Sequence, residues 1–279
     1  MSRIKIHSLC TPSHGYIGFF KIVKEWERLG FIEIGEPATC PTQKKFGQHM
    51  FTVWVGRVGG MALEPTLTRL TYTPKDPFEH ALVTEYTNDV REIANTHPWN
   101  FWVRHLDDYD AVRNQLSTID KEIESFFSGT IRKRHPIRNA WMDSTEVFSW
   151  RVARRYTRMN RLAKTMKDYY MLLASSKFGL CPMGDQGYCQ REVECLGLGV
   201  IPIFTPGVEY NYHEPLVKDV HFIYAENPEE MNRKISEMDE EKIKWMINNG
   251  LEYYERRISP KGMWNSVLET VDKYNIKVD

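Results

Sequence analysis

The 279-residue sequence has no excess charge of either sign, because 37 basic and 37 acidic residues cancel to a formal net charge of zero. A chain without a basic excess has no overall field that attracts nucleic acid, so nucleic acid is not an expected partner and any anion site must be local. Cysteine is also scarce: there are five, an odd number, and no CxxC pair. This pattern favours reduced thiols over a disulfide framework.

Long apolar runs are missing as well. The N-terminus has no extended apolar segment of the signal-peptide type, and no stretch approaches the ~18 uninterrupted apolar residues that indicate a transmembrane helix. Internal repeats and low-complexity linkers are absent too. From the sequence we therefore expect a soluble, cytoplasmic protein without a membrane span.

Strand-like and helix-like segments alternate along the chain, which predicts an α/β protein. We expect two Rossmann-like halves, residues 1–120 and 121–279, with the last helix able to pack back on the first half. In the first half we predict strands over 4–10, 31–34, 51–58 and 101–103, helices over 19–29 and 111–124, and loops over 61–98 apart from one helix near 85–95. In the second half we predict strands over 126–131, 178–181, 200–204 and 220–224, and helices over 147–171, 228–238, 240–255 and after Pro260.

The most informative segment spans residues 178–204. It predicts a buried strand, a polar glycine-bearing loop, a helix and a second buried strand, which together form a βαβ unit. Such a loop feeds a helix N-terminus, where open α/β sheets bind anions. Arg191 and Glu194 stand three residues apart and so share one helix face. A guanidinium suits phosphate and a carboxylate suits sugar hydroxyls, which favours a nucleotide sugar; the alternative is a surface ion pair on an ordinary crossover helix.

This segment resembles the C-terminal signature of the exostosin-like family of glycosyltransferases. The residues that match are Pro182, Gly184, Arg191, Glu194 and the Ile-Pro-Ile run at 201–203. Cys189 stands where the family usually has serine. A second match lies upstream in the family's order, where Phe127-Ser-Gly-Thr-Ile-Arg132 is followed by Ile137-Arg138.

The resemblance implies a compact GT-B-like arrangement, with an acceptor-binding first half, a nucleotide-sugar-binding second half and the active site in the cleft between them. It also implies an inverting glycosyltransferase. Within the family, the length and the lack of an anchor resemble small virus-encoded xylosyltransferases, which implies UDP-xylose as the donor and a glycan or glycoprotein as the acceptor. The implied donor-binding residues are Gly129, Thr130, Arg132, Arg138, Pro182, Gly184, Arg191 and Glu194.

An inverting transfer also needs a general base on the acceptor hydroxyl. His14 follows the first predicted strand, where several GT-B enzymes place a histidine. The acidic run at 105–110 offers Asp107, Asp108 and Asp110 instead, and we favour Asp108. Trp99-Asn100 and this run resemble the family's N-terminal motif only with gaps, because Phe101 replaces its arginine and the Asp-His order is absent.

The same run invites a metal hypothesis, because Asp108-Tyr-Asp110 is a literal DxD. Two aspartates before a helix are more often N-capping or dipole-compensating residues. Cys189, Cys195 and His213 fit no standard zinc spacing. We therefore expect no metal and no cofactor beyond the donor. A non-catalytic carbohydrate- or nucleotide-sugar-binding domain of the same fold is the alternative function.

Overall fold

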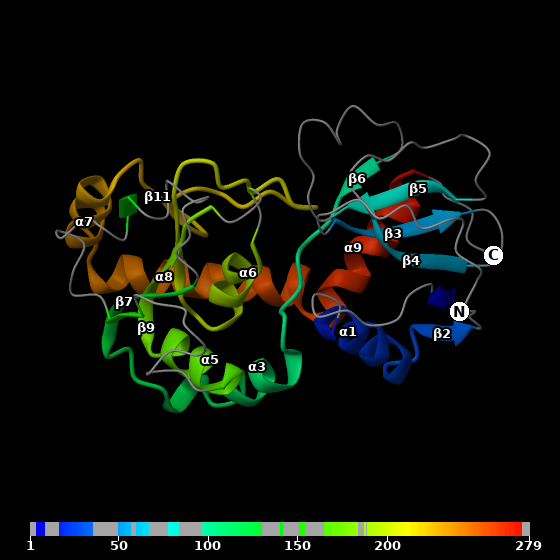
Figure 1. Cartoon of the computed structure of the whole chain (residues 1–279), viewed down its shortest axis with the longest axis horizontal. Coiled ribbons are helices and arrows are strands. Elements are labelled where there is room, and N and C mark those ends of the chain that lie inside the picture. The colour runs from blue at the N-terminus through cyan, green and yellow to red at the C-terminus, as the bar shows by residue number, and fades with distance from the viewer. Residues whose placement is uncertain are drawn as a thin grey trace. The chain divides into compact units, whose positions relative to one another are not determined.

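The structure is a computed structural model, and it describes the backbone of residues 4–8, 17–35, 50–56, 60–66, 78–83, 96–129, 140–141, 151–153, 165–183, 187 and 189–274. Side chains are described for residues 21–32, 97–129, 140–141, 165–183, 187 and 189–274. The chain divides into two compact units (Figure 1). The first comprises residues 1–104, 211–214 and 256–279, and the second comprises 105–210 and 215–255.

The first unit contains a mixed β-sheet and two described helices. Its described strands are β1 (Ile4–Ser8), β2 (Ile32–Gly35), β3 (Met50–Gly56), β4 (Gly60–Thr66), β5 (Phe78–Val83) and β6 (Thr96–Pro98), in the order β2-β1-β4-β3-β5-β6. Strand β3 is antiparallel to both β4 and β5, whereas β1 is parallel to β2 and β4. The antiparallel centre distinguishes this sheet from the parallel sheet of a Rossmann-like half. The helices are α1 (Ile17–Arg28) and α9 (Pro260–Lys273).

The C-terminal helix of the first unit is held by one tryptophan and one buried asparagine. Trp26 of α1 donates its indole N–H to the Pro260 carbonyl over 2.6 Å, and its ring lies 5.2 Å from that of Trp264. The Asn100 amide donates to the Arg257 carbonyl over 2.9 Å and accepts the His213 backbone N–H over 3.1 Å. One fully buried side chain thus fastens two chain segments that are distant in sequence.

The second unit contains a five-stranded sheet in which every described pairing is parallel. The strands are β7 (Ile123–Ser128), β8 (Arg151–Ala153), β9 (Ser176–Cys181), β10 (Ile201–Phe204) and β11 (Ile223–Tyr224), in the order β11-β10-β9-β7-β8. Its helices are α3 (Leu106–Arg113), α5 (Met166–Ala174), α6 (Gln190–Gly197), α7 (Pro228–Ser236) and α8 (Glu240–Tyr253). A 3₁₀ turn covers Leu116–Thr118, and a π-helical turn, Tyr254–Ile258, continues α8.

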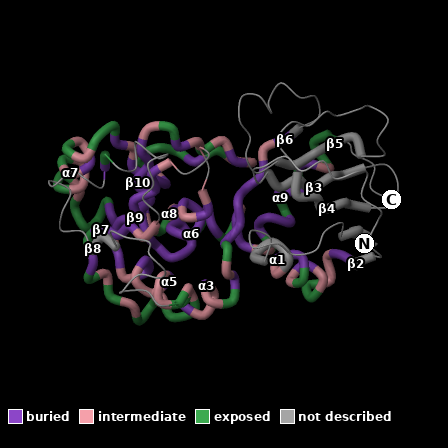
Figure 2. Tube along the Cα trace, in the orientation of Figure 1, coloured by how far each residue is buried: buried purple, intermediate pink, exposed green. Residues whose placement is uncertain are grey.

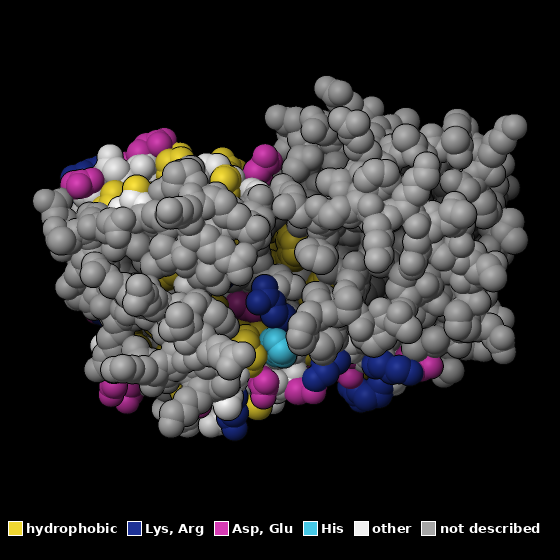
Figure 3. Space-filling view, in the orientation of Figure 1, with side chains coloured by type: hydrophobic (Ala, Val, Ile, Leu, Met, Phe, Trp, Pro, Cys, Tyr) yellow, Lys and Arg dark blue, Asp and Glu magenta, His cyan; other side chains and the backbone are white. Residues whose placement is uncertain are grey.

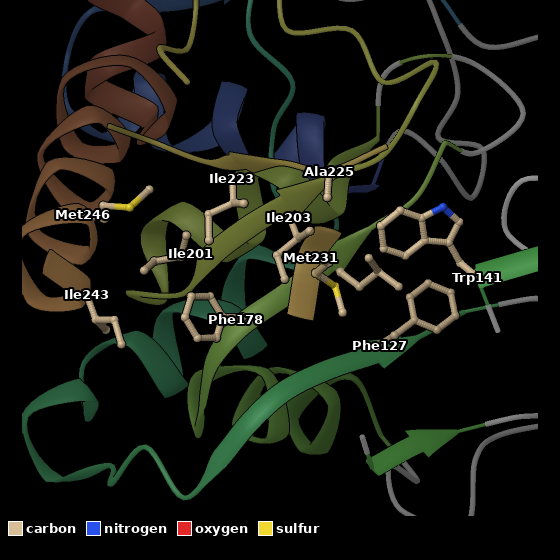
Figure 4. Packing of buried hydrophobic residues seen from close by; sticks show 11 residues of the cluster. Phe127, Trp141, Phe178, Ile201, Ile203, Ile223, Ala225, Met231, Ile243 and Met246 are labelled. Atoms are coloured by element: carbon tan, nitrogen blue, oxygen red, sulfur yellow. The ribbon is translucent and has the colours of Figure 1, made fainter. Parts of the chain in front are cut away.

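The core of the second unit lies between its sheet and helices α7 and α8. Figure 4 shows apolar side chains from β7, β9, β10 and β11 meeting Met231 of α7 and Ile243 and Met246 of α8. Strands β9 and β10 and helix α6 are buried along most of their length (Figure 2). Burial on both sides explains why these strands are apolar without alternation.

Charges of both signs are mixed on the described residues of one face. On the face in Figure 3, acidic and basic side chains of the described residues lie close to one another. On α1, for example, Lys24 pairs with Glu27 and Arg28 with Glu25. None of the described helices combines the length and the apolar content needed to cross a membrane.

Many predicted elements are confirmed. They include β1, α1, β2, β7, β9, β10 and the last three helices, with shifts of a few residues at their ends. The residues just before α7, α8 and α9 are Asn227, Asp239 and Ser259, whose side chains accept N–H groups of the first turn. Polar residues of this kind are strong signals for a helix start.

Four predictions are wrong. Residues 61–98, predicted as loops, contribute strands β4, β5 and β6, and residues 101–103 form no strand. The helix predicted over 111–124 instead begins at Leu106 and ends at Arg113. Within 147–171, predicted as one helix, Arg151–Ala153 form β8 and α5 begins at Met166. Strand pairing with distant partners decides these segments, and local composition does not report it. The predicted helix near 85–95 lies outside the described residues.

Candidate functional site

The candidate site lies where the strand order of the second unit reverses. After β7 the chain forms β8 on one side of β7 and then β9 on its other side. Strands β7 and β9 are therefore adjacent, and the chain that leaves them leads toward opposite edges of the sheet. In open parallel sheets, ligands bind outside the carboxyl ends of the strands at such a point. Ser128 ends β7, and the segment after β9 leads into α6.

Arg191, in the first turn of α6, reaches across to the end of β7. Its Nη2 donates to the Ser128 carbonyl over 2.8 Å, and its guanidinium carbon lies 4.7 Å from the ring centroid of Phe127. A Cβ added to Gly129 would come within 2.8 Å of Nη2. The structure therefore brings together two predicted site residues, Gly129 and Arg191, that are far apart in sequence.

Two further donor nitrogens of Arg191 lack a hydrogen-bond partner in the part of the chain that the structure describes. Its Nε and Nη1 are buried and have no hydrogen-bond partner among the described residues. Burial lowers the pKa of Arg191, but nearby groups, first among them the thiol of Cys189, raise that pKa overall, so the guanidinium stays charged. A buried donor without a partner costs about 1–3 kcal/mol, and more for a charged group. This arrangement suits an anionic ligand that occupies both nitrogens.

The N-terminus of α6 adds to the positive character of the site. Its N-cap, Cys189, makes no side-chain hydrogen bond to the first turn, whereas α5, α7, α8 and α9 are all capped by side chains. An uncapped helix start presents backbone N–H groups and the positive end of the helix dipole. Cys189 therefore leaves this end of α6 without a side-chain acceptor in its first turn.

Glu194 lies one turn further along α6 and is only 4% exposed. Its Oε1 accepts the Tyr170 hydroxyl over 3.0 Å, and its Oε2 accepts the Tyr169 hydroxyl over 3.1 Å. Burial, followed by the charge of Glu194, raises the pKa of both tyrosines, so they remain neutral donors. Glu194 and Arg191 share a helix face as predicted, but they form no ion pair with each other in the described structure. Glu194 is buried, and Arg191 is half-buried with its Nε and Nη1 atoms inaccessible to solvent. The alternative of a surface ion pair is wrong.

The segments that follow β9 and β10 are joined beside the site. Pro182 is buried directly after β9, and the Met183 N–H donates to the Thr205 hydroxyl over 3.4 Å. Further along, the Glu209 N–H donates to the Gly187 carbonyl over 2.7 Å. These contacts fix the ends of the loop that contains Gly184, although Gly184 itself lies outside the described residues.

The predicted acidic residues occupy the first turn of α3. Asp107 is exposed and Asp108 is half-buried, while Leu106, Tyr109 and Val112 form the buried face of the helix. This position is compatible with dipole compensation as well as with catalysis. The other predicted site residues, His14, Thr130, Arg132 and Arg138, lie outside the described residues.

Two residues of the site were not predicted: Tyr169 and Tyr170. They hold the Glu194 carboxylate from α5, 25 and 24 residues earlier in the chain. Consecutive tyrosines on a helix are ordinary core residues by composition. Only the packing of α5 against α6 reveals their role.

The described residues contain no group of three or more His, Cys, Asp or Glu side chains placed to hold a metal ion. Cys181, Cys189 and Cys195 are free thiols, and the Sγ atoms of Cys181 and Cys195 lie 3.8 Å apart. Burial raises the pKa of the Cys181 thiol. Cys10 and Cys40 lie outside the described residues.

Comparisons with known proteins add little to this geometry. No family model matches the chain, and no curated protein matches it. Among solved structures, the chain is similar to the C-terminal domain of a glycosyl transferase group 1 family protein from Francisella tularensis. The match covers 57% of this chain and 93% of that domain, with 12% identity and a TM-score of 0.36. The assignment of a function therefore rests on the chain's own residues.

Proposed function

We propose that the protein is a glycosyltransferase that takes its sugar from a nucleotide donor bound at the carboxyl ends of β7 and β9. One observation carries this proposal: two buried guanidinium nitrogens of Arg191 have no hydrogen-bond partner among the described residues, and they lie on the same helix face as a buried carboxylate, Glu194. Phosphate oxygens complement the first group, and the hydroxyls of a ribose complement the second. Both groups lie at the strand-order reversal, where nucleotides bind in parallel sheets.

The finer assignments rest on the sequence resemblance. We propose UDP-xylose as the donor, a glycan or glycoprotein hydroxyl as the acceptor, and transfer with inversion. The acceptor is assigned to the first half of the chain. Arg191 and the start of α6 stabilise the negative charge that develops on the departing diphosphate, a task for which fixed positive groups suffice. Transfer is therefore proposed to proceed without a metal ion.

The alternative is a domain that binds nucleotide sugars and has no general base. Both hypotheses predict affinity for UDP, so the deciding measurement is turnover. The purified protein is incubated with UDP-xylose, UDP-glucose and UDP-N-acetylglucosamine, with and without glycan acceptors, in EDTA and in Mn²⁺. Release of UDP is then followed alongside calorimetric binding of UDP.

We expect UDP to bind, UDP-xylose to be consumed faster than the other donors, and EDTA to leave the rate unchanged. Binding without turnover on any acceptor supports the non-catalytic alternative. Turnover that appears only with Mn²⁺ contradicts the metal-free proposal and favours the DxD hypothesis at Asp108 and Asp110. No binding of UDP or of any UDP-sugar contradicts both functions.

A further inference from the structure

Glu194 can bind a ligand only if its carboxylate keeps one orientation. Two tyrosines of α5 fix that orientation. The Tyr169 hydroxyl donates to one carboxylate oxygen and the Tyr170 hydroxyl to the other. Both ring systems are packed: Tyr169 lies 6.0 Å from Phe126, and Tyr170 lies edge-on to Tyr109 at 5.2 Å. Side chains confined in this way hold a partner group more accurately than mobile ones.

The helix that carries both tyrosines is itself well fixed. At its start, the Thr165 hydroxyl accepts the Asp168 N–H over 3.1 Å, and the Asp168 carboxylate accepts the Thr165 N–H over 2.9 Å. This reciprocal capping box satisfies two N–H groups of the first turn. The tyrosines therefore act from a rigid element.

The hydrogen-bond capacity of Glu194 leaves room for a ligand. An ionised carboxylate offers about four acceptor positions, and the tyrosine hydroxyls occupy two of them in the described structure. Both neighbours donate to the carboxylate, so each of its oxygens already acts as an acceptor. The vacant positions thus select a ligand with hydroxyl donors, such as the 2′- and 3′-hydroxyls of a ribose.

We infer that Tyr169 and Tyr170 are positioning residues that fix the Glu194 carboxylate and thereby make the site selective for ribonucleotides over deoxyribonucleotides. The inference rests on the proposed function, because it assumes that a nucleotide occupies the site. The tyrosines do not contact the donor themselves. Their hydroxyls act through the orientation of the Glu194 carboxylate.

The test compares the affinities of UDP and 2′-deoxy-UDP, measured by calorimetry, in the full chain and in three variants. Tyr169→Phe and Tyr170→Phe each remove one hydroxyl from the carboxylate and keep the ring. Tyr109→Phe is the matched control, because its buried hydroxyl donates over 3.1 Å to the backbone carbonyl of the same Glu194 and not to its carboxylate. Tyr169→Phe is the cleaner test, since the Tyr170 hydroxyl also accepts the His105 N–H.

We expect the full chain to prefer UDP over 2′-deoxy-UDP by about tenfold, the usual effect of a charge-assisted hydrogen bond. Tyr169→Phe and Tyr170→Phe should reduce this preference by about threefold or more, while Tyr109→Phe should keep it even if its melting temperature falls. An unchanged preference in both test variants overturns the inference, as does an equal loss in Tyr109→Phe. A full chain that binds neither nucleotide overturns the proposed function itself.

Discussion

The guanidinium of Arg191 lies over the ring of Phe127, 4.7 Å from its centroid, while its Nη2 bonds the carbonyl of the next residue, Ser128. A similar arrangement recurs at the other end of α6. There, Arg113 lies 4.7 Å from the ring centroid of Tyr254 and donates to the Gly197 carbonyl over 3.1 Å. The two arginines differ in one respect: Arg113 forms an ion pair with Glu255, whereas Arg191 has no carboxylate partner among the described residues.

This pair of arginines separates a binding role from a structural one. Arg191→Met keeps an apolar side chain over Phe127 but removes the charge, so UDP affinity should fall by about tenfold or more. The unfolding free energy of the ligand-free protein should change by no more than about 1 kcal/mol, because an unsatisfied buried charge is lost together with one hydrogen bond. Calorimetry with UDP and urea unfolding measure the two effects.

The matched variant, Arg113→Met, should show the opposite pattern. Its loss leaves the Gly197 carbonyl without this donor and breaks the ion pair with Glu255, so stability should fall by about 1–2 kcal/mol while UDP affinity stays unchanged. If Arg113→Met and Arg191→Met lose UDP affinity equally, the site has been wrongly placed.

Gly129 tests the site by steric means. In Gly129→Ala the new methyl group would lie 2.8 Å from Arg191 Nη2 and 2.8 Å from Phe127 Cζ. The arginine end is flexible and can move, but the Phe127 ring is fully buried, so the variant should fold with a stability lower by about 1–3 kcal/mol. UDP affinity, measured by calorimetry on the folded variant, should fall several-fold, and the midpoint of urea unfolding should fall as well. Full affinity in this variant would show that the observed position of Arg191 is not needed for binding.

The sequence predicts which residues could contact a ligand at this site better than it predicts the residues that hold them in place. Arg191 and Glu194 could be assigned to one helix face because their spacing alone places them there. The hydrogen bonds that orient the Glu194 carboxylate could not be predicted, because Tyr169 and Tyr170 of α5 reach it only in the folded protein. The strands β4 and β8 were missed for the same physical reason: their pairing with β3 and β7 depends on residues outside the local segment.

The general base is still a prediction, and kinetics can assign it. If Asp108 is the base, Asp108→Asn should lower turnover by ~10²–10⁴ and leave donor affinity nearly intact, because the base contacts the acceptor. If Asp108 only compensates the dipole of α3, Asp108→Asn should instead lower the unfolding free energy by about 0.3–1 kcal/mol and leave turnover unchanged. An inactive His14→Ala beside a fully active Asp108→Asn would assign the role to His14.

Gly197 is required for the packing of α6 against its neighbours. A Cβ at this position would overlap the Tyr109 hydroxyl and the Tyr254 ring at Cδ2, and both rings are fully buried. Gly197→Ala should therefore destabilise the protein by about 1–3 kcal/mol or more.

The control for Gly197 is Gly250, in α8. A Cβ there meets Leu196 Cδ2 at 3.2 Å, the end of a flexible side chain. Because alanine favours a helix over glycine by up to about 1 kcal/mol, Gly250→Ala should be neutral or stabilising. Thermal unfolding of both variants measures the difference in stability. If both variants lose a similar amount of stability, the close contacts around Gly197 do not determine the effect of its substitution.

Lys121 joins the ends of two helices and should give the protein a distinctive pH dependence. Its ammonium group donates to the Ala174 carbonyl over 2.7 Å and to the Leu198 carbonyl over 3.3 Å, at the ends of α5 and α6. Burial lowers the pKa of Lys121 to about 8. In the unfolded chain the pKa of lysine is about 10.4.

Between these two pKa values the unfolded chain binds a proton that the folded protein has lost, so the contribution of Lys121 to the unfolding free energy rises with pH. From about pH 7.5 to 9.5 this gain should amount to about 2 kcal/mol. Within this window the buried Cys181 thiol, whose pKa is raised by burial, acts in the opposite direction, and the buried tyrosines do so above the unfolded tyrosine pKa of about 10. The contribution of Lys121 is therefore measured as the difference between this protein and Lys121→Met. Lys121→Met should be less stable through the loss of both hydrogen bonds, yet its stability should not show this gain. Urea unfolding of both proteins across the window measures the difference, and parallel profiles would mean that the lysine keeps its ordinary pKa on folding.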